Sequence, residues 1–279
     1  MAAGALVAAG RLTDSDRSSG SPVAATVDRF DERRAFEFLE WQVRLGPRPA
    51  GSAAARKLAA RLRSTIPAGR YQAVPGGLRN VIGTVPGRQP GRVVVVGSHY
   101  DTKEIPGFVG ANDGASSTAV VRELARTIEP GEARSTLVFA FFDGEESPRG
   151  TPSNRFEERG LRGSKVASRV FRDASAMVLL DLVGDKDLSF PQEAGSDQAL
   201  FERIRAAARR IGKADYFPAL AGPQVLDDHI PFQKEGVPAA VVIDFEFACW
   251  HRRCDNLQGV SAESLDVIGE TMLELLREL

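Results

Sequence analysis

Residues 93–101 read Val-Val-Val-Val-Gly-Ser-His-Tyr-Asp, an unbroken apolar run that ends in a histidine and a carboxylate. Similar runs occur at residues 138–142, Val-Phe-Ala-Phe-Phe, and at residues 177–180, Met-Val-Leu-Leu. Because the apolar residues follow one another instead of alternating with polar ones, both faces of each strand must be covered. That pattern is typical of parallel strands between two layers of helices.

The surrounding sequence alternates between strand-like and helix-like segments. Strand character marks residues 80–85, 92–97, 135–142, 176–180 and 239–243. Helical periodicity marks residues 31–45, 52–64, 115–128, 198–211 and 261–279. This alternation predicts an α/β fold in the form of a three-layer sandwich. We expect one domain over residues 28–279, preceded by a disordered Ala/Gly/Ser-rich leader over residues 1–27.

Composition and charge bear on whether the chain binds nucleic acid, spans a membrane or is secreted. The 279 residues are 43% hydrophobic and carry a net charge of -1, which suits an ordinary globular protein and argues against nucleic-acid binding. No apolar run approaches the roughly 18 residues of a membrane helix. Residues 2–9 lack the basic start of a secretory signal, so a cytoplasmic or an exported location stays open. Cys249 and Cys254 could form a local disulfide, remain free thiols or act as soft ligands.

The three histidines of the chain all stand close to carboxylates. His99 is followed by Asp101, His229 follows Asp227 and Asp228, and His251 precedes Asp255. Imidazole nitrogens together with carboxylate oxygens are the donors of catalytic zinc sites. His229 is interpreted as a structural or supporting residue.

Several of these residues follow the ends of predicted strands. Open α/β sheets bind ligands at the carboxyl ends of their strands, so we expect these side chains to meet in one cleft. The candidate metal ligands are His99, Asp113, Glu146, Asp181 and His251. Glu145, next to a ligand but pointing in another direction, is the candidate general base. Two histidines and three carboxylates suit one or two zinc ions.

Seven stretches together resemble the zinc metallopeptidases of family twenty-eight and the related animal-type glutaminyl cyclases. They occur in the family's order and cover the chain from about residue 30 to its end. The stretches are His99-Tyr100-Asp101, Phe108-Val109-Gly110-Ala111-Asn112-Asp113, Phe141-Phe142-Asp143-Gly144-Glu145-Glu146, Leu161-Arg162-Gly163-Ser164, Leu179-Leu180-Asp181-Leu182-Val183-Gly184, Asp227-Asp228-His229-Ile230-Pro231-Phe232 and Trp250-His251. The resemblance implies a three-layer α/β/α sandwich with a mixed, mainly parallel central sheet.

As a peptidase, the chain would use two zinc ions. The resemblance implies that Asp113 bridges them, that His99 and Asp181 complete one site, and that Glu146 and His251 complete the other. Asp101 would support His99. Glu145 would deprotonate a water that attacks the first peptide bond of a peptide or small protein.

As a glutaminyl cyclase, the chain would hold a single zinc ion on Asp113, Glu146 and His251. Asp181 and Asp227 would then join Glu145 in a proton relay. Trp250 would line the pocket for the N-terminal residue, and the α-amine of the substrate would attack its own side-chain amide.

Two departures from the cyclase pattern favour an aminopeptidase. Val241 stands where the animal cyclases carry a relay histidine, and the polar segment 147–160 lacks a tryptophan. The cyclase stays the alternative, and a non-catalytic metal-binding relative is a third reading. A serine hydrolase is excluded because residues 114–117, Gly-Ala-Ser-Ser, do not form a Gly-x-Ser-x-Gly elbow.

Overall fold

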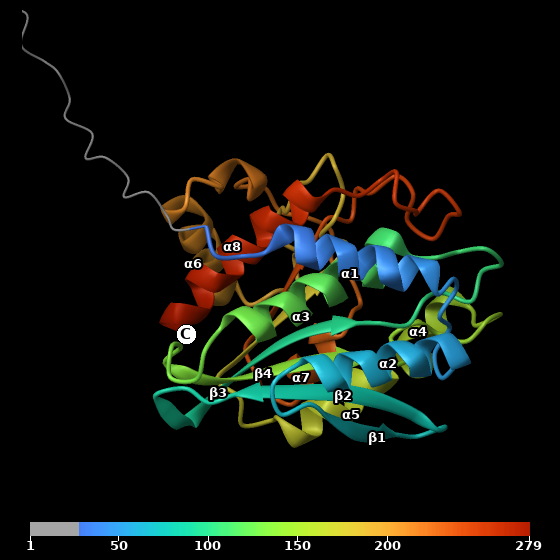
Figure 1. Cartoon of the computed structure of the whole chain (residues 1–279), viewed down its shortest axis with the longest axis horizontal. Coiled ribbons are helices and arrows are strands. Elements are labelled where there is room, and N and C mark those ends of the chain that lie inside the picture. Colours follow the sequence, from blue (N-terminus) through green and yellow to red (C-terminus); the bar gives the residue numbers. More distant parts are fainter. Residues whose placement is uncertain (1–27) are drawn as a thin grey trace, which may run out of the picture.

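A six-stranded sheet lies at the centre of the computed structural model, which describes residues 28–279 (Figure 1). The strands are β1 (Arg70–Val74), β2 (Leu78–Val85), β3 (Gln89–His99), β4 (Ser135–Phe142), β5 (Ala176–Asp181) and β6 (Ala239–Ile243). Their order across the sheet is β1-β2-β4-β3-β5-β6. Strands β4, β3, β5 and β6 run parallel, whereas β1 pairs with β2 and β2 with β4 in antiparallel fashion. The predicted mixed, mainly parallel sheet is confirmed.

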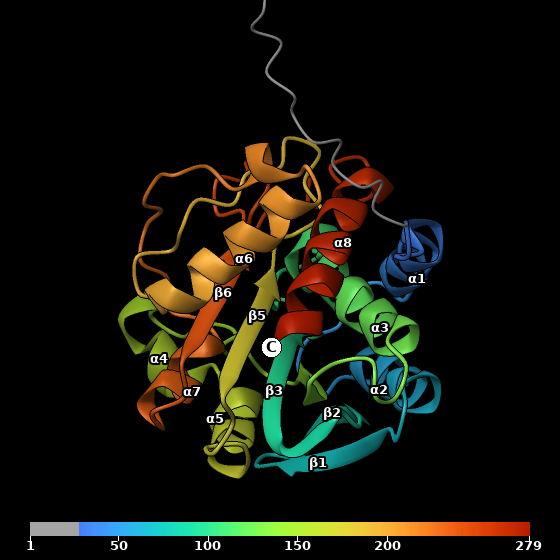
Figure 2. The same cartoon turned by 90° about the vertical axis from the view of Figure 1, so that its left-hand side faces the viewer.

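Helices cover both faces of this sheet (Figure 2). One face packs against α2 (Ala53–Thr65), α3 (Ser117–Thr127), α6 (Gln198–Arg210) and α8 (Ala262–Glu278), and α1 (Glu32–Arg44) packs on the outer side of α3 and α8. The other packs against α5 (Arg162–Val170) and α7 (His229–Lys234). Shorter elements are α4 (Phe156–Arg159), the π-helical turn η1 (Ala111–Ser116), and the 3-10 turns η2 (Ser153–Arg155) and η3 (Ala214–Tyr216). The three-layer sandwich is therefore confirmed.

The apolar strands contribute side chains to two hydrophobic cores, one on each face of the sheet. Val94 and Val96 of β3 lie in the hydrophobic cluster beneath α3 and α8, while Val95 lies in the cluster beneath α5 and α7. Successive side chains of a strand point to opposite faces. A strand buried on both faces must therefore be apolar at every position, which is why these runs do not alternate.

Polar side chains fix the starts of several helices. Asp31, Ser52, Asp197 and Ser261 each accept a hydrogen bond from the backbone amide three residues ahead. Such caps satisfy amides that have no partner within the helix. Helices α1, α2, α6 and α8 consequently begin within one residue of their predicted starts.

The segments not predicted from the sequence are β1, α5 and α7, together with the short elements α4, η2 and η3. Strand β1 lies at the sheet edge and is mostly exposed, so it lacks a buried apolar run. Helix α5 buries Gly163, Ser164, Ala167 and Ser168, whose small side chains give no apolar stripe. Helix α7 is six residues long and contains a proline. The predicted leader lies outside the described residues. Within residues 28–279, no helix combines the length and apolar character needed to span a membrane.

Candidate metal centre and active site

The carboxyl ends of the parallel strands bring the candidate residues to one rim of the sheet. His99 is the last residue of β3 and Asp181 is the last residue of β5. Glu145 and Glu146 follow the end of β4, and His251 lies in the loop after β6. The expected convergence at strand ends matches this placement.

Asp113 reaches the rim through the turn η1, which lies between β3 and α3. Its neighbours Gly110 and Gly114 have φ angles of 52° and 89°, and Asp113 itself has a non-helical ψ of 93°. A Cβ at Gly110 would lie 2.3 Å from the carbonyl oxygen of Asp113, and one at Gly114 would lie 2.9 Å from the His99 ring. Glycine at 110 lets the turn fold back on the Asp113 carbonyl, and glycine at 114 lets the backbone pass close to His99.

Two groups of potential ligands share the Asp113 carboxylate. In the first, His99 Nε2 lies 3.3 Å from Asp113 Oδ1 and 3.2 Å from Asp181 Oδ1. In the second, His251 Nε2 lies 3.4 Å from Asp113 Oδ2 and 3.1 Å from Glu146 Oε1. Donor atoms held by one tetrahedral zinc at about 2 Å lie roughly 3.3 Å apart. Both groups therefore fit a zinc ion, with Asp113 placed between them.

The hydrogen bonds of His99 sharpen this fit. Its Nδ1 lies 3.1 Å from the backbone carbonyl of Asp101, which can only accept, so Nδ1 carries the hydrogen. In a neutral ring, Nε2 then carries no hydrogen, and its lone pair faces the oxygens of Asp113 and Asp181. Asp113 Oδ2 has no hydrogen-bond partner. Only a cation or an extra proton between these atoms removes the repulsion of such an arrangement.

The pKa directions agree with this charge pattern. Burial disfavours the charged ring of His99, but the Asp181 charge and hydrogen bonds to neighbouring carboxylates outweigh it and raise the His99 pKa well above its usual value. Burial likewise disfavours the Asp113 carboxylate, yet hydrogen bonding to His99 lowers the pKa of Asp113. The site thus stabilises positive charge at the place where a metal ion would sit.

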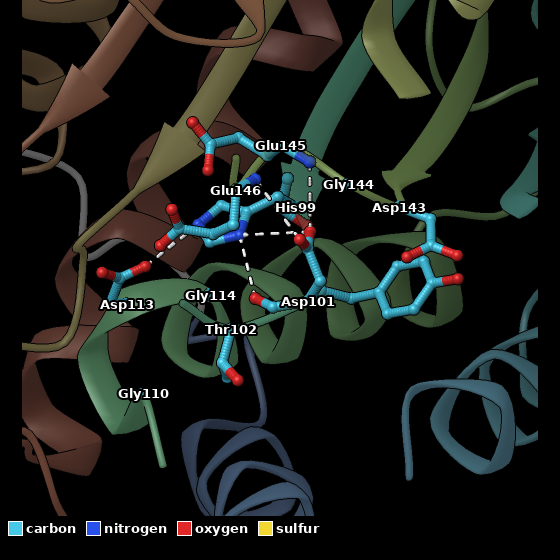
Figure 3. A network of polar contacts seen from close by, with 12 residues as sticks. His99, Asp101, Thr102, Gly110, Asp113, Gly114, Asp143, Gly144, Glu145 and Glu146 are labelled. Atoms are coloured by element: carbon cyan, nitrogen blue, oxygen red, sulfur yellow. Dashed lines mark hydrogen bonds and ion pairs between the residues drawn. The ribbon is translucent and has the colours of Figure 1, made fainter. Parts of the chain in front are cut away.

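Asp101 orients the two glutamates (Figure 3). Its carboxylate oxygens accept hydrogen bonds from the backbone amides of Glu145, at 3.2 Å, and Glu146, at 3.3 Å. From the sequence we expected Asp101 to support His99. In the structure the Asp101 carboxylate lies 3.8 Å from His99 Nδ1, and the Asp101 backbone carbonyl lies 3.1 Å from the same nitrogen.

Glu145 lines a cleft of about 460 Å³ next to the ligand groups. Burial, followed by the charge of Glu146, raises the pKa of Glu145 well above its usual value. A carboxyl group in that state can take up and release a proton. The cleft lining also includes Lys103, Asp113, Glu146, Phe156, Asp181, Asp227, Phe245, Trp250 and His251.

The Asp227-Asp228-His229 motif lies behind the cleft at the start of α7. Asp227 is buried, its Oδ2 has no hydrogen-bond partner, and burial with the charges of Asp181 and Asp228 raises its pKa well above its usual value. Burial raises the pKa of Asp228 to about 7. His229 lies 3.6 Å from Glu193 Oε2 and belongs to neither ligand group. Of this motif, only Asp227 lines the cleft.

The loop that carries His251 is closed by a disulfide bond between Cys249 and Cys254. His251 has a φ of 54°, a left-handed conformation that a non-glycine residue rarely adopts. Its ring is stacked on Trp250 at a centroid distance of 4.2 Å and meets Phe108 edge-on at 6.1 Å. Of the three states that the sequence left open for Cys249 and Cys254, the structure shows the disulfide.

Three buried or half-buried residues at the site had no role assigned to them from the sequence. Lys103 donates to Glu146 Oε2 at 2.7 Å, and Asp255 and Arg48 contact the turn that carries Asp113. Their positions offered faint signals: Lys103 follows Asp101 by two residues, and Asp255 follows His251 by four. Arg48 stands between two prolines after a helix and carried no signal of this kind.

Comparison with known families and proteins gives consistent matches. The model of peptidase family M28 matches residues 80–276. A glutaminyl-peptide cyclotransferase of Bothrops jararaca is 30% identical over 221 residues, which cover 65% of this chain and 60% of that protein. The chain thus spans about 60% of the length of the curated relatives it matches first.

Solved structures of two named activities share the fold. The glutaminyl cyclase of an Acidobacteriales bacterium superposes with a TM-score of 0.76 at 28% identity, covering 89% of this chain and 94% of that one. A Zn-dependent exopeptidase of Parabacteroides distasonis has a TM-score of 0.75 at 26% identity, covering 90% and 99%. Since the family model covers more than half of the chain, this protein belongs to peptidase family M28.

Proposed function

We propose that this chain is a zinc-dependent exopeptidase that hydrolyses the first peptide bond of peptides or small proteins. One observation carries the proposal: the two oxygens of Asp113 face two different histidine-carboxylate groups. A bridging carboxylate between two complete ligand groups is the arrangement of two-metal hydrolases. Zinc bound there would polarise a carbonyl oxygen and acidify water.

Glu145 is the proton carrier in this proposal. It lines the cleft beside Asp113 and Glu146 without belonging to either ligand group. Its raised pKa brings its proton affinity closer to that of the groups it must serve at neutral pH. Glu145 takes a proton from the attacking water and then passes it to the departing amine.

The cleft itself fits the N-terminus of a peptide. Five carboxylates line it, against one lysine, Lys103; the carboxylates are Asp113, Glu145, Glu146, Asp181 and Asp227. Bound zinc would offset the charges of Asp113, Glu146 and Asp181, which leaves Glu145 and Asp227 to contact the ammonium group of a free N-terminus. Phe156, Phe245 and Trp250 add aromatic walls that would contact an apolar first side chain.

A second candidate is a glutaminyl-peptide cyclotransferase with one zinc ion, favoured by Asp227. This acid lines the cleft, is buried beside Asp181 and has an unpartnered oxygen, which suits a proton relay with Glu145. The names of the curated relatives point the same way. In this reaction Glu145 moves a proton from the attacking α-amine to the departing ammonia, and no water is consumed.

A paired assay with metal counting separates the two reactions. Purified protein is given aminoacyl arylamides and peptides with N-terminal glutamine, and bound zinc is counted in the wild type and in Asp181→Ala. The exopeptidase should hydrolyse arylamides, hold two zinc ions and lose one of them in the variant. Cyclisation with one zinc ion, unchanged in the variant, would identify the cyclase instead.

The matched control is Asp187→Ala, which removes an exposed carboxylate six residues further along the chain. It should keep the metal content and activity of the wild type. Absence of both reactions in zinc-loaded protein would reject both candidates.

A further inference from the structure

Two buried side chains, Arg48 and Asp255, form hydrogen bonds with the backbone of the turn that carries Asp113. Asp255 accepts hydrogen bonds from the amide of Asn112, at 2.7 Å, and from the amide of Asp113 itself, at 3.0 Å. Arg48 donates to the carbonyl oxygens of Val109, at 2.9 Å, and Gly110, at 3.2 Å. The carboxylate thus holds the amides of this turn while the guanidinium holds its carbonyls.

Neither charge is exposed to solvent. Arg48 and Asp255 are both 0% exposed. Burial lowers the pKa of Arg48 to about 10, so Arg48 stays charged at neutral pH. Burial and the Asp113 charge raise the pKa of Asp255 to about 7, and hydrogen bonds from the Asn112 and Asp113 amides oppose this effect. Burying such groups is costly unless each is hydrogen-bonded. Asp255 directs both of these bonds to the turn, whereas Arg48 also donates to the carbonyl oxygens of Gln42 and Gly46 and so ties the turn to the end of α1.

The turn needs such support because it is not regular helix. Gly110 and Gly114 take left-handed φ angles, and Asp113 leaves the helical region. Regular hydrogen bonding therefore does not fix the direction in which the Asp113 side chain points. The bonds from Asp255 to the Asn112 and Asp113 amides fix it directly.

Asp255 also links this turn to the other side of the site. It directly follows Cys254, whose disulfide closes the loop that holds His251. The same short segment therefore carries one ligand, His251, and the anchor of another, Asp113. This coupling sets the distance between the two candidate ligands.

We propose that Arg48 and Asp255 are positioning residues that hold the Asp113 carboxylate between both metal ions and thereby set the affinity of the two ions together. This inference rests on the proposed two-metal site. Removing His251 or Asp181 should weaken one ion only, whereas misplacing the shared Asp113 should weaken both. That joint loss distinguishes positioning from ordinary ligation.

The test uses Asp255→Asn in the full chain, with zinc affinities measured by competition against a chromophoric chelator. The amide keeps the shape of the side chain but presents an NH₂ group to one of the two backbone amides. We expect a fall of about 10- to 100-fold in the affinity for each ion, as for other groups that orient metal ligands. The absorption spectrum of the Co²⁺-loaded protein should change as well, because it reports ligand geometry.

Glu270→Gln is the matched control. Glu270 accepts hydrogen bonds from two successive backbone amides, those of Arg29 and Phe30, and its charged neighbours lie outside the metal centre. The control should lose stability without loss of zinc affinity. Arg48→Lys supplies a second arm, since lysine keeps the charge but not the fork that spans two carbonyls. It should also weaken both ions.

Zinc affinities within twofold of wild type in folded Asp255→Asn and Arg48→Lys would overturn the proposal. The proposal would also be overturned if both metal-free variants failed to fold, because the Arg48 and Asp255 contacts would then be needed for the fold of the domain and not specifically for the metal centre. Weakening of a single ion would also reject it. If wild-type protein binds no zinc, or only one ion, the proposed two-metal function fails before the variants are compared.

Discussion

Glu145 and Glu146 are neighbours in sequence but lie in different surroundings. Glu146 is held on both oxygens, by His251 at 3.1 Å and by Lys103 at 2.7 Å. Glu145 instead faces the cleft, where burial raises its pKa. Adjacent side chains point apart, so one glutamate can be fixed as a ligand while the other handles protons.

The variant Glu145→Gln tests this division. The amide has the same shape but cannot accept a proton, so turnover should fall by at least about 100-fold. Zinc content, measured by atomic absorption, should stay at the wild-type value because Glu145 lies outside both ligand groups. Glu158→Gln, on the exposed face of α4, is the control. Turnover within tenfold of wild type would refute the assignment of Glu145 as base.

At the scale of elements, the turn η1 is the least regular part of the site and also its centre. It presents Asp113 by combining two left-handed glycines with a non-helical aspartate. The approach of its backbone to the His99 ring leaves no room for a side chain at Gly114. The sequence Gly-Ala-Asn-Asp-Gly over residues 110–114 is thus a requirement of geometry as well as of chemistry.

Comparing Gly110→Ala with Gly131→Ala distinguishes the loss of stability caused by a steric clash from the loss caused by backbone strain alone. Both glycines have positive φ, but a Cβ at Gly131 meets nothing within 4 Å, whereas one at Gly110 meets the Asp113 carbonyl at 2.3 Å. Gly131→Ala should cost about 1 kcal/mol from its φ alone. Gly110→Ala should cost several kcal/mol and reduce zinc binding. Chemical denaturation and zinc titration measure both, and equal costs for the two variants would contradict the clash.

At the scale of the molecule, the fold forces carboxylates from distant segments into one small volume. Asp113 comes from η1, Glu146 from the loop after β4 and Asp181 from the end of β5. Together with Glu145 and Asp227 they face one cleft. Like charges at such distances repel, so the folded state should depend on a bound cation.

Metal removal measures that dependence. Chelation should lower the midpoint of thermal unfolding, and added zinc should restore it, since an ion that binds only the folded state stabilises it. At a free concentration of 100 times Kd, each ion contributes about 2.7 kcal/mol. Asp113→Asn should show a much smaller zinc-dependent shift. A chelated wild type that melts at its zinc-loaded temperature would contradict the prediction.

Much of the fold could be predicted from local patterns. The strands at residues 135–142 and 239–243 coincide with β4 and β6, because strands buried on both faces must be apolar throughout. The family motifs led to all five residues of the two ligand groups. Strand β1 escaped because it is mostly exposed, α5 because its buried residues are small, and α7 because it is six residues long and contains a proline.

Local sequence patterns predict the layers of the fold and the rim on which the candidate site forms, because apolar runs and strand ends can be recognised without knowing any tertiary contact. The family motifs add the candidate ligands and the shared Asp113. Two contacts are visible only in the folded chain: the Asp101 carbonyl beneath the His99 ring, and the anchor at Asp255, 143 residues beyond Asn112. Such contacts follow from how the strands and turns pack in space, which the order of residues along the chain does not specify locally.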